Sequence, residues 1–240
     1  MHAQATWLKR LFKNISSGSC SLCRGSLEPS HGAICAACSD ALPWMHNSCQ
    51  RCALPLENAQ LCIACATAPP PYQRCIAALH YRPPMNYLIG DIKRDAYAPV
   101  TRQLALQCAR VFNRAYRRRL PDLLVPVPLH WSKQLRRGFN QCELLGRHLT
   151  EALPEIQLRC DICRRTGRAP PQRRQSKINR KRAVADAFNC PIPLDQARIA
   201  ILDDVVTTGA TAASMTNSLL AAGARQVDVW CIARTGWNNY

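Results

Sequence analysis

The sequence lacks any run of about 18 uncharged apolar residues, which is the length that a membrane-spanning helix requires. Residues 1–18 also lack the apolar core and the small-residue cleavage site of a secretion signal. They instead place Trp7, Leu8, Leu11 and Phe12 among basic residues, which predicts a short amphipathic segment. This pattern favours docking on the protein itself over contact with a membrane surface. We therefore expect no membrane span and a cytoplasmic location, where cysteines stay reduced.

Acidic residues are scarce, because 15 Asp and Glu face 32 Lys and Arg and leave a net charge of +17. The excess is concentrated: residues 159–182 carry ten basic side chains and one acid. Such a field attracts polyanions, either nucleic acid or a small substrate with several phosphates, although a solvated basic surface remains an alternative. A second basic cluster consists of Arg110, Arg114, Arg117, Arg118 and Arg119.

Aromatic residues make up only 6% of the sequence, and none lies between residues 159 and 182. Without aromatic side chains on which bases stack, contact between this segment and nucleic acid would act through phosphates. Its affinity would therefore fall steeply with salt.

Cysteine, in contrast, is abundant, with 15 residues. Eight of them form four Cys-x-x-Cys pairs before residue 68, and two such pairs complete a tetrahedral zinc site. We expect two structural zinc ions, whose binding supplies folding free energy on the order of 10 kcal/mol per site. Pairing of neighbours in order is favoured, while interleaved pairing stays open. The expected ligands are Cys20, Cys23, Cys35, Cys38, Cys49, Cys52, Cys62 and Cys65.

A fifth pair, Cys160-x-x-Cys163, stands alone in a stretch that we expect to be a strand. Because a site with four cysteine ligands needs two pairs, we do not count it as a metal ligand.

The composition changes near residue 68, and the proline-rich stretch 67–71 predicts a stiff linker. We therefore expect a cysteine module at 19–68 and a larger domain at 72–240. Alternating strands and helices with short connections predict an α/β fold with a parallel sheet. The expected strands are 74–81, 122–125, 199–202 and 227–232; the helices are 99–115, 145–152 and 211–222; and basic loops lie at 133–138 and 164–182.

The most informative segment follows the apolar run that begins at Ile199. Two carboxylates, Asp203 and Asp204, precede a Thr-Thr-Gly-Ala-Thr turn that opens a helix. Unpaired N–H groups of such a turn bind phosphate, and Gly209 permits close approach of the backbone. Paired acids would repel the phosphate itself, so they should face hydroxyl groups or a metal. A ribose 5-phosphate meets both demands. The alternative without a ligand is that Thr211 only caps the helix and that the two acids are solvated.

Asp203-Asp204-Val205-Val206-Thr207-Thr208-Gly209-Ala210-Thr211 resembles the phosphoribosyl-pyrophosphate-binding motif of type I phosphoribosyltransferases. Together with the cysteine pairs and Arg136-Arg137-Gly138-Phe139-Asn140-Gln141, it makes the chain similar to the ComF family of bacterial competence proteins. Its GntX-type members, linked to use of DNA as a nutrient, are the most similar. The resemblance covers about residues 20–234. It implies a phosphoribosyltransferase fold, a parallel sheet flanked by helices, with an N-terminal double zinc ribbon.

The resemblance also implies roles. Asp203 and Asp204 would meet the ribose hydroxyls, and residues 207–211 would hold the 5-phosphate. The segment after residues 125–128 would lie near the pyrophosphate, and loop 164–182 would close over the site. Family positions in that loop are matched by Arg165, Thr166 and Gln172, whereas Ala183 departs from the usual Asn.

In phosphoribosyl transfer, pyrophosphate leaves as charge builds on it, so Mg²⁺ and basic groups stabilise the transition state. Arg136 and Arg137 are the candidates here, beside the mobile loop. The turn offers no carboxylate or histidine that could deprotonate a base, and we expect the lone His130 to be structural. Catalysis and ligand sensing therefore both stay open.

Two hypotheses follow. The first is a phosphoribosyl-pyrophosphate-binding enzyme or regulator that handles imported DNA alongside DNA-uptake proteins. The second is a non-catalytic adaptor that binds single-stranded DNA through the ribbon and the Arg-rich loop. The two can coexist.

Overall fold

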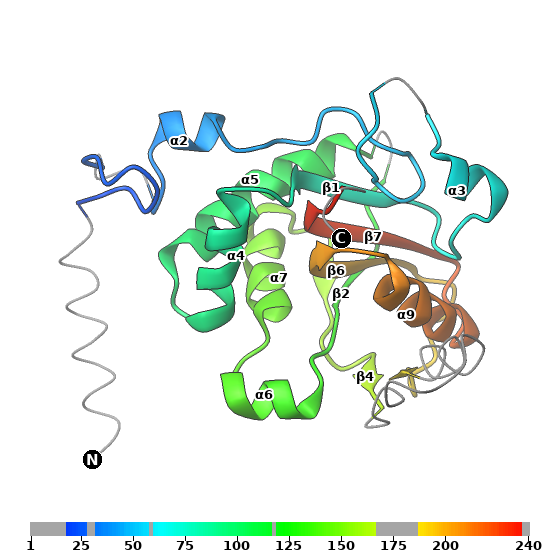
Figure 1. The fold of residues 1–240 in the computed structure, drawn as a ribbon. Helices are drawn as coiled ribbons and strands as arrows, with labels where there is room; N and C mark the ends of the chain where they lie inside the picture. The colour runs from blue at the N-terminus through cyan, green and yellow to red at the C-terminus, as the bar shows by residue number, and fades with distance from the viewer. Residues whose placement is uncertain (1–17, 28–31, 58–59, 117–118, 167–186, 237–240) are drawn as a thin grey trace, which may run out of the picture.

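The computed structural model describes residues 18–27, 32–57, 60–116, 119–166 and 187–236. At its centre lies a five-stranded, all-parallel sheet with the order β1-β7-β6-β2-β3 (Figure 1). Its strands are β1 (Cys75–His80), β2 (Leu123–Pro126), β3 (Gln157–Leu158), β6 (Arg198–Val206) and β7 (Gln226–Arg234).

Strands β6 and β7 are buried along most of their length, as the apolar runs of a sheet covered on both faces require. In β6, Ile199 and Ile201 pack into one core, and Ala200 and Leu202 pack into the other. Since successive side chains of a strand point to opposite faces, the sheet separates two hydrophobic layers.

Helices cover both faces of the sheet (Figure 1). Buried side chains of α4, α5 and α7 fill the core that contains Leu202, whereas Met215 and Leu219 of α9 fill the core that contains Ile201. The connection from β6 through α9 to β7 is the expected βαβ unit. The helices are α4 (Met85–Arg94), α5 (Pro99–Arg114), α6 (Trp131–Arg137), α7 (Gln141–Ala152) and α9 (Ala210–Ala221).

The cysteine-rich module contains two short helices, α2 (Ala36–Asp40) and α3 (Ile63–Thr67). Its first part docks on α5 through Gln103. The side-chain oxygen of Gln103 accepts hydrogen bonds from the N–H groups of Ala33 and Ile34, each at 2.7 Å. Its amide nitrogen donates to the carbonyl of Ile34, so one side chain fixes this loop against the larger domain. Trp44 adds an isolated bridge to Leu79 of β1.

The expected α/β fold class is confirmed, but several elements differ from the predictions. Residues 131–137 form helix α6 rather than a basic loop, because His130 caps its start and Gly138 ends it with a left-handed φ of 77°. The structural role expected for His130 is thus found. Helix α4 was not predicted at all. Strand β6 runs four residues beyond the apolar stretch and ends at Val206, so the two aspartates lie within it.

Three further predictions concern shorter segments. The strand expected at 122–125 ends one residue later, at Pro126, because proline lacks an N–H but keeps its carbonyl available to the sheet. Residues 160–163 are not a strand. Arg164–Arg165 forms the short strand β4, paired antiparallel with β5 (Phe188–Asn189). The rest of the basic loop (167–182) and most of the N-terminal segment (1–17) lie outside the described residues.

No helix in the described part of the chain is long and apolar enough to cross a membrane.

Candidate functional site

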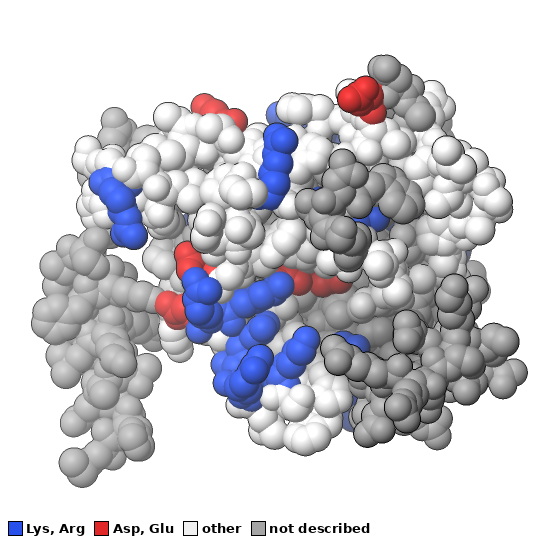
Figure 2. Space-filling view, viewed as in Figure 1, with Lys and Arg blue, Asp and Glu red and all other residues white. Residues whose placement is uncertain are grey.

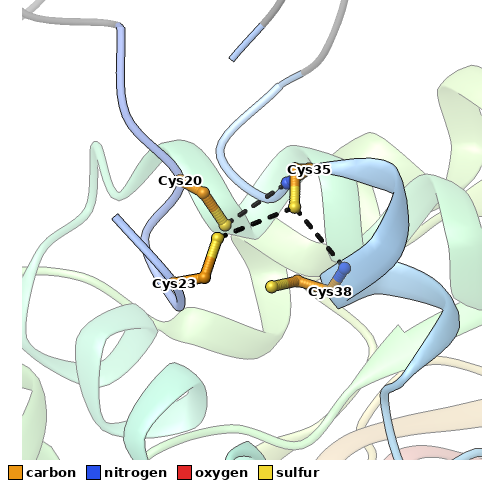
Figure 3. Close-up of side chains that lie close together, drawn as sticks. All are labelled: Cys20, Cys23, Cys35 and Cys38. Carbon is orange, nitrogen blue, oxygen red and sulfur yellow. Dashed lines mark hydrogen bonds between the residues drawn. The ribbon is translucent and has the colours of Figure 1, made fainter. Parts of the chain in front are cut away.

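The first two cysteine pairs converge on one point (Figure 3). The sulfur atoms of Cys20, Cys23, Cys35 and Cys38 all lie within 4.8 Å of one another. Cys35 caps the start of α2, and its own N–H donates to the sulfur of Cys20 at 3.4 Å. The N–H of Cys38 donates to the sulfur of Cys35 at 3.5 Å. We call residues 20–38 the first ribbon.

The third and fourth pairs form a second cluster of the same kind. The sulfur atoms of Cys49, Cys52, Cys62 and Cys65 also lie within 4.8 Å of one another. Cys62 immediately precedes α3 without capping it through its side chain, and its N–H donates to the sulfur of Cys49 at 3.3 Å. We call residues 49–65 the second ribbon. Neighbouring pairs are thus joined in order, as the sequence favoured.

The donor chemistry of both clusters fits zinc, which prefers four thiolates in a tetrahedral arrangement. Burial by itself would raise the pKa of Cys20, but N–H donors from residues 23, 35 and 22 lower it to about 6. The same balance of burial against N–H donors lowers the pKa of Cys49 to about 7. The local backbone therefore stabilises the thiolate form of Cys20 and Cys49, whereas burial raises the pKa of Cys52 and Cys65 and hydrogen bonds with neighbouring cysteines raise that of Cys38.

The isolated Cys160-x-x-Cys163 pair does not join either cluster. Cys160 is exposed, whereas Cys163 is buried directly before β4, and interaction with Cys190 together with burial raises the pKa of its thiol.

The predicted phosphate-binding turn lies between β6 and α9. Gly209 takes the left-handed conformation, with φ of 79°, at the N-terminus of α9. Thr207 and Thr208 are exposed, and the hydroxyl of Thr208 accepts a hydrogen bond from the N–H of Ala210 at 3.3 Å. The first N–H groups of a helix have no partner within the helix, so this exposed turn can receive an anion. Val205, Val206 and Thr211 complete the motif around it.

Asp203 and Asp204 lie near the end of β6, two residues before the turn. The Nζ atom of Lys93, on α4, lies 2.7 Å from Oδ2 of Asp204, which is 5% exposed. Asp203 lies beside Cys142 of α7, whose sulfur is 4.0 Å from Oδ1 of the carboxyl group. Only one of the two acids therefore has a basic partner among the described residues.

Burial and the neighbouring Asp204 carboxylate raise the pKa of Asp203 well above its ordinary value of 3.8. The folded chain therefore binds a proton at Asp203 up to a higher pH than the unfolded chain does. Below pH 3.8 both states are protonated and no free energy is lost. As the pH rises above that value, the unfolded state ionises more readily, so the free energy of unfolding falls.

We predict that Asp203→Asn stabilises the ligand-free protein at neutral pH, because the amide has no charge to desolvate. The gain should grow as the pH rises from about 5 to about 8, and each kcal/mol should raise Tm by about 2–4 °C. Thermal unfolding of the zinc-loaded protein measures it, with Asp91→Asn as the exposed control. A gain that shrinks with rising pH would contradict the assignment.

The basic candidates lie in several places. Arg136 is exposed on α6, and Arg137 hydrogen-bonds to Gln141 at the start of α7. Since α6 follows the carboxyl end of β2 and the turn follows that of β6, both belong to the same edge of the parallel sheet. Figure 2 shows basic side chains gathered on the side of the molecule that carries α4 and α6. Arg165 lies in β4 over the ring of Phe188, and Gln172 lies outside the described residues.

Lys93 is a site residue that sequence reasoning missed. Met85, Leu88, Ile89 and Ile92 are buried at the spacing of an amphipathic helix, and this signal would have revealed α4. The position of Lys93 on the last turn of that helix would then have placed a cation near the sheet. Its pairing with Asp204 is not local in sequence.

Residues 14–66 match the family model of a double zinc ribbon domain. DNA utilization protein YhgH of Escherichia coli is 37% identical over 222 residues, which are 91% of this chain and 97% of that protein. Competence protein F of Haemophilus influenzae is 30% identical over 222 residues, which are 90% of this chain and 96% of that protein.

Among solved structures, the allosteric regulatory enzyme of purine biosynthesis is 15% identical with a TM-score of 0.36, covering 54% of this chain and 25% of that chain. A purine phosphoribosyltransferase from Pyrococcus horikoshii is 14% identical with a TM-score of 0.33, covering 58% of this chain and 90% of that chain. At these TM-scores the fold class rests on the sheet and helices described above.

The parallel sheet with flanking helices, the two four-cysteine clusters and the family match define an α/β protein with an N-terminal double zinc ribbon. The chain belongs to the ComF family, together with DNA utilization protein YhgH and competence protein F.

Proposed function

We propose that this protein binds phosphoribosyl pyrophosphate, or a similar ribose 5-phosphate ligand, in the cytoplasm during the utilization of DNA. The observation that carries the proposal is the exposed turn at 207–211, which opens α9 two residues after a pair of adjacent carboxylates. The names of the relatives supply the biological setting, in which DNA-uptake proteins would be its partners.

The turn and the acids would bind different parts of the ligand. N–H groups at the start of α9 and the hydroxyls of Thr207, Thr208 and Thr211 bind the 5-phosphate. Asp203 and Asp204 accept hydrogen bonds from the ribose hydroxyls. Lys93 neutralises Asp204 and thereby reduces the repulsion between the acids and the nearby phosphate.

Mg²⁺ would enter with the pyrophosphate rather than occupy a cage built by the protein alone. It prefers oxygen ligands, which the two carboxylates offer, and the adjacent thiol of Cys142 is a poor ligand for it. Arg136 and Arg137 would contact the pyrophosphate, with Arg165 and Gln172 as further candidates. These groups bind and orient a leaving group, so they serve transfer and sensing alike.

Isothermal titration of the zinc-loaded protein with phosphoribosyl pyrophosphate and Mg²⁺ tests the proposal. We predict saturable binding to wild type and a loss of at least about tenfold in affinity in Asp203→Asn/Asp204→Asn, because the amides cannot accept from the diol as carboxylates do. Asp91→Asn, an exposed acid on the helix that carries Lys93, is the matched control and should bind like wild type. Absence of heat with wild type, or equal affinity in the double variant, would reject the proposal.

A further inference from the structure

The side chain of Arg234 joins the phosphate-binding turn to the second ribbon. Arg234 is the last residue of β7 and is only 6% exposed. Its Nε atom donates to the carbonyl of Cys52, a member of the second four-cysteine cluster, at 3.0 Å. Its Nη1 atom donates to the carbonyls of Val206, at 3.2 Å, and of Thr207, the first residue of the turn.

The guanidinium of Arg234 is a buried charge whose hydrogen-bond partners are all uncharged groups. Among the described residues, no carboxylate lies within 4.0 Å of Arg234, and its hydrogen bonds run to oxygen atoms of Cys52, Val206, Thr207 and Thr235. A buried charge without an ion partner is costly unless hydrogen bonds satisfy it, so each of these contacts matters. The positive charge also lies behind the turn, where it favours an anion.

A second contact runs beside the first. Ala53 of the second ribbon packs in the same core as Tyr72. The hydroxyl oxygen of Tyr72 lies 3.1 Å from the position that a Cβ atom on Gly209 would take. Tyr72 therefore shares a core with the second ribbon and reaches the turn, in addition to the hydrogen bonds through which Arg234 joins the two.

We propose that Arg234 is a positioning residue that couples occupancy of the second zinc site to the shape, and hence the anion affinity, of the turn at 207–211. Zinc fixes the backbone at Cys52, Arg234 holds that carbonyl and those of Val206 and Thr207 in one arrangement, and the turn stays preorganised. Loss of the metal releases one end of this connection. The effect on affinity rests on the proposed function, whereas the effect on the turn does not.

The ligand-free arm of the test is a double-mutant cycle on the full-length, zinc-loaded chain, read by hydrogen exchange of the amides at 207–211. Cys65→Ser removes a ligand of the second zinc without touching Arg234. We expect Arg234→Gln and Cys65→Ser each to speed exchange of the turn about tenfold, and the double variant to speed it no further. Arg74→Gln is the matched control. The side chain of Arg74 contacts Asp228 of β7, Ala115 and Tyr116, and is bonded neither to Cys52 nor to the turn.

An unchanged turn in Cys65→Ser, or additive effects in the double variant, would overturn the coupling. Arg234→Lys keeps the charge but loses the planar fork, so it should speed exchange less than Arg234→Gln. This variant also keeps the test valid if Arg234→Gln fails to fold.

The second arm measures linkage between zinc and ligand. Chelator competition gives the zinc affinity of the second site with and without phosphoribosyl pyrophosphate and Mg²⁺. We expect the ligand to tighten zinc binding by about 5- to 150-fold in wild type, by a smaller factor in Arg234→Lys and by a factor near one in Arg234→Gln. A purely structural arginine would lower stability without changing that ratio. If wild type binds no ligand, the proposed function fails, and the exchange experiment still decides the role of Arg234.

Discussion

Replacing Cys65 with serine will leave the chain with one zinc ion instead of two and will unfold the second ribbon. The core of this ribbon consists of buried Cys49, Leu54, Cys62 and Cys65, with Cys52 and Leu56 packed against them. Four of its six members are metal ligands, so little apolar surface remains to hold it without zinc. Metal binding supplies folding free energy on the order of 10 kcal/mol per site, and one missing ligand removes much of it. Metal analysis should give about one zinc per chain, and amide exchange in the second ribbon should rise about a hundredfold or more.

The first ribbon offers an informative contrast. Cys20, Ile34 and Leu42 belong to the large core that contains α4, α5 and α7, and Gln103 fixes the loop as well. Cys38→Ser should therefore also release one zinc, while the amide of Ile34 keeps part of its protection. Cys160→Ser changes an exposed cysteine outside both clusters and should retain both ions. Two zinc ions and unchanged exchange in Cys65→Ser would show that the apolar contacts suffice.

The features that the sequence predicted correctly are written in local patterns. Two residues between cysteines, and about ten between pairs, bring four sulfur atoms together whatever surrounds them. The apolar run before Asp203 and the turn before Thr211 likewise specify a strand and a helix from nearest neighbours alone. The short connections between them also predicted a parallel sheet, in which β6 and β7 are indeed paired.

The features that were missed depend on the rest of the fold. Helix α6 has no buried residue, so the sequence shows no apolar stripe from which it could be predicted. Only its capping residues define its ends. Lys93 and Asp204 are more than a hundred residues apart, as are Cys52 and Arg234. No spacing rule joins such pairs, because their meeting requires the sheet order and the docking of the ribbon to be known.

Replacing Gly209 with alanine will lower the stability of the protein for two separate reasons and will lower the ligand affinity of the turn. With φ of 79°, an L-residue at this position costs roughly 1–2 kcal/mol. The new Cβ atom would also lie 3.1 Å from the hydroxyl oxygen of Tyr72, which is buried and has little room to move. We expect denaturant unfolding to show a loss of about 2–3 kcal/mol. Titration should show ligand affinity at least about tenfold lower, because the N–H groups of the turn are displaced.

Two further variants separate the two costs. Gly223, at the other end of α9, also has a left-handed φ, of 97°, but its Cβ would meet only a backbone nitrogen at 4.0 Å. Gly223→Ala should therefore lose only the stability that the backbone conformation costs, and it should bind ligand like wild type. Tyr72→Phe removes the oxygen that Gly209→Ala would approach, so the double variant should regain the steric part of the loss and much of the affinity. If Gly209→Ala loses no more stability than Gly223→Ala, and the double variant binds no better than Gly209→Ala alone, then Tyr72 does not restrict the turn. The affinity of the turn would then have to depend on its backbone conformation alone.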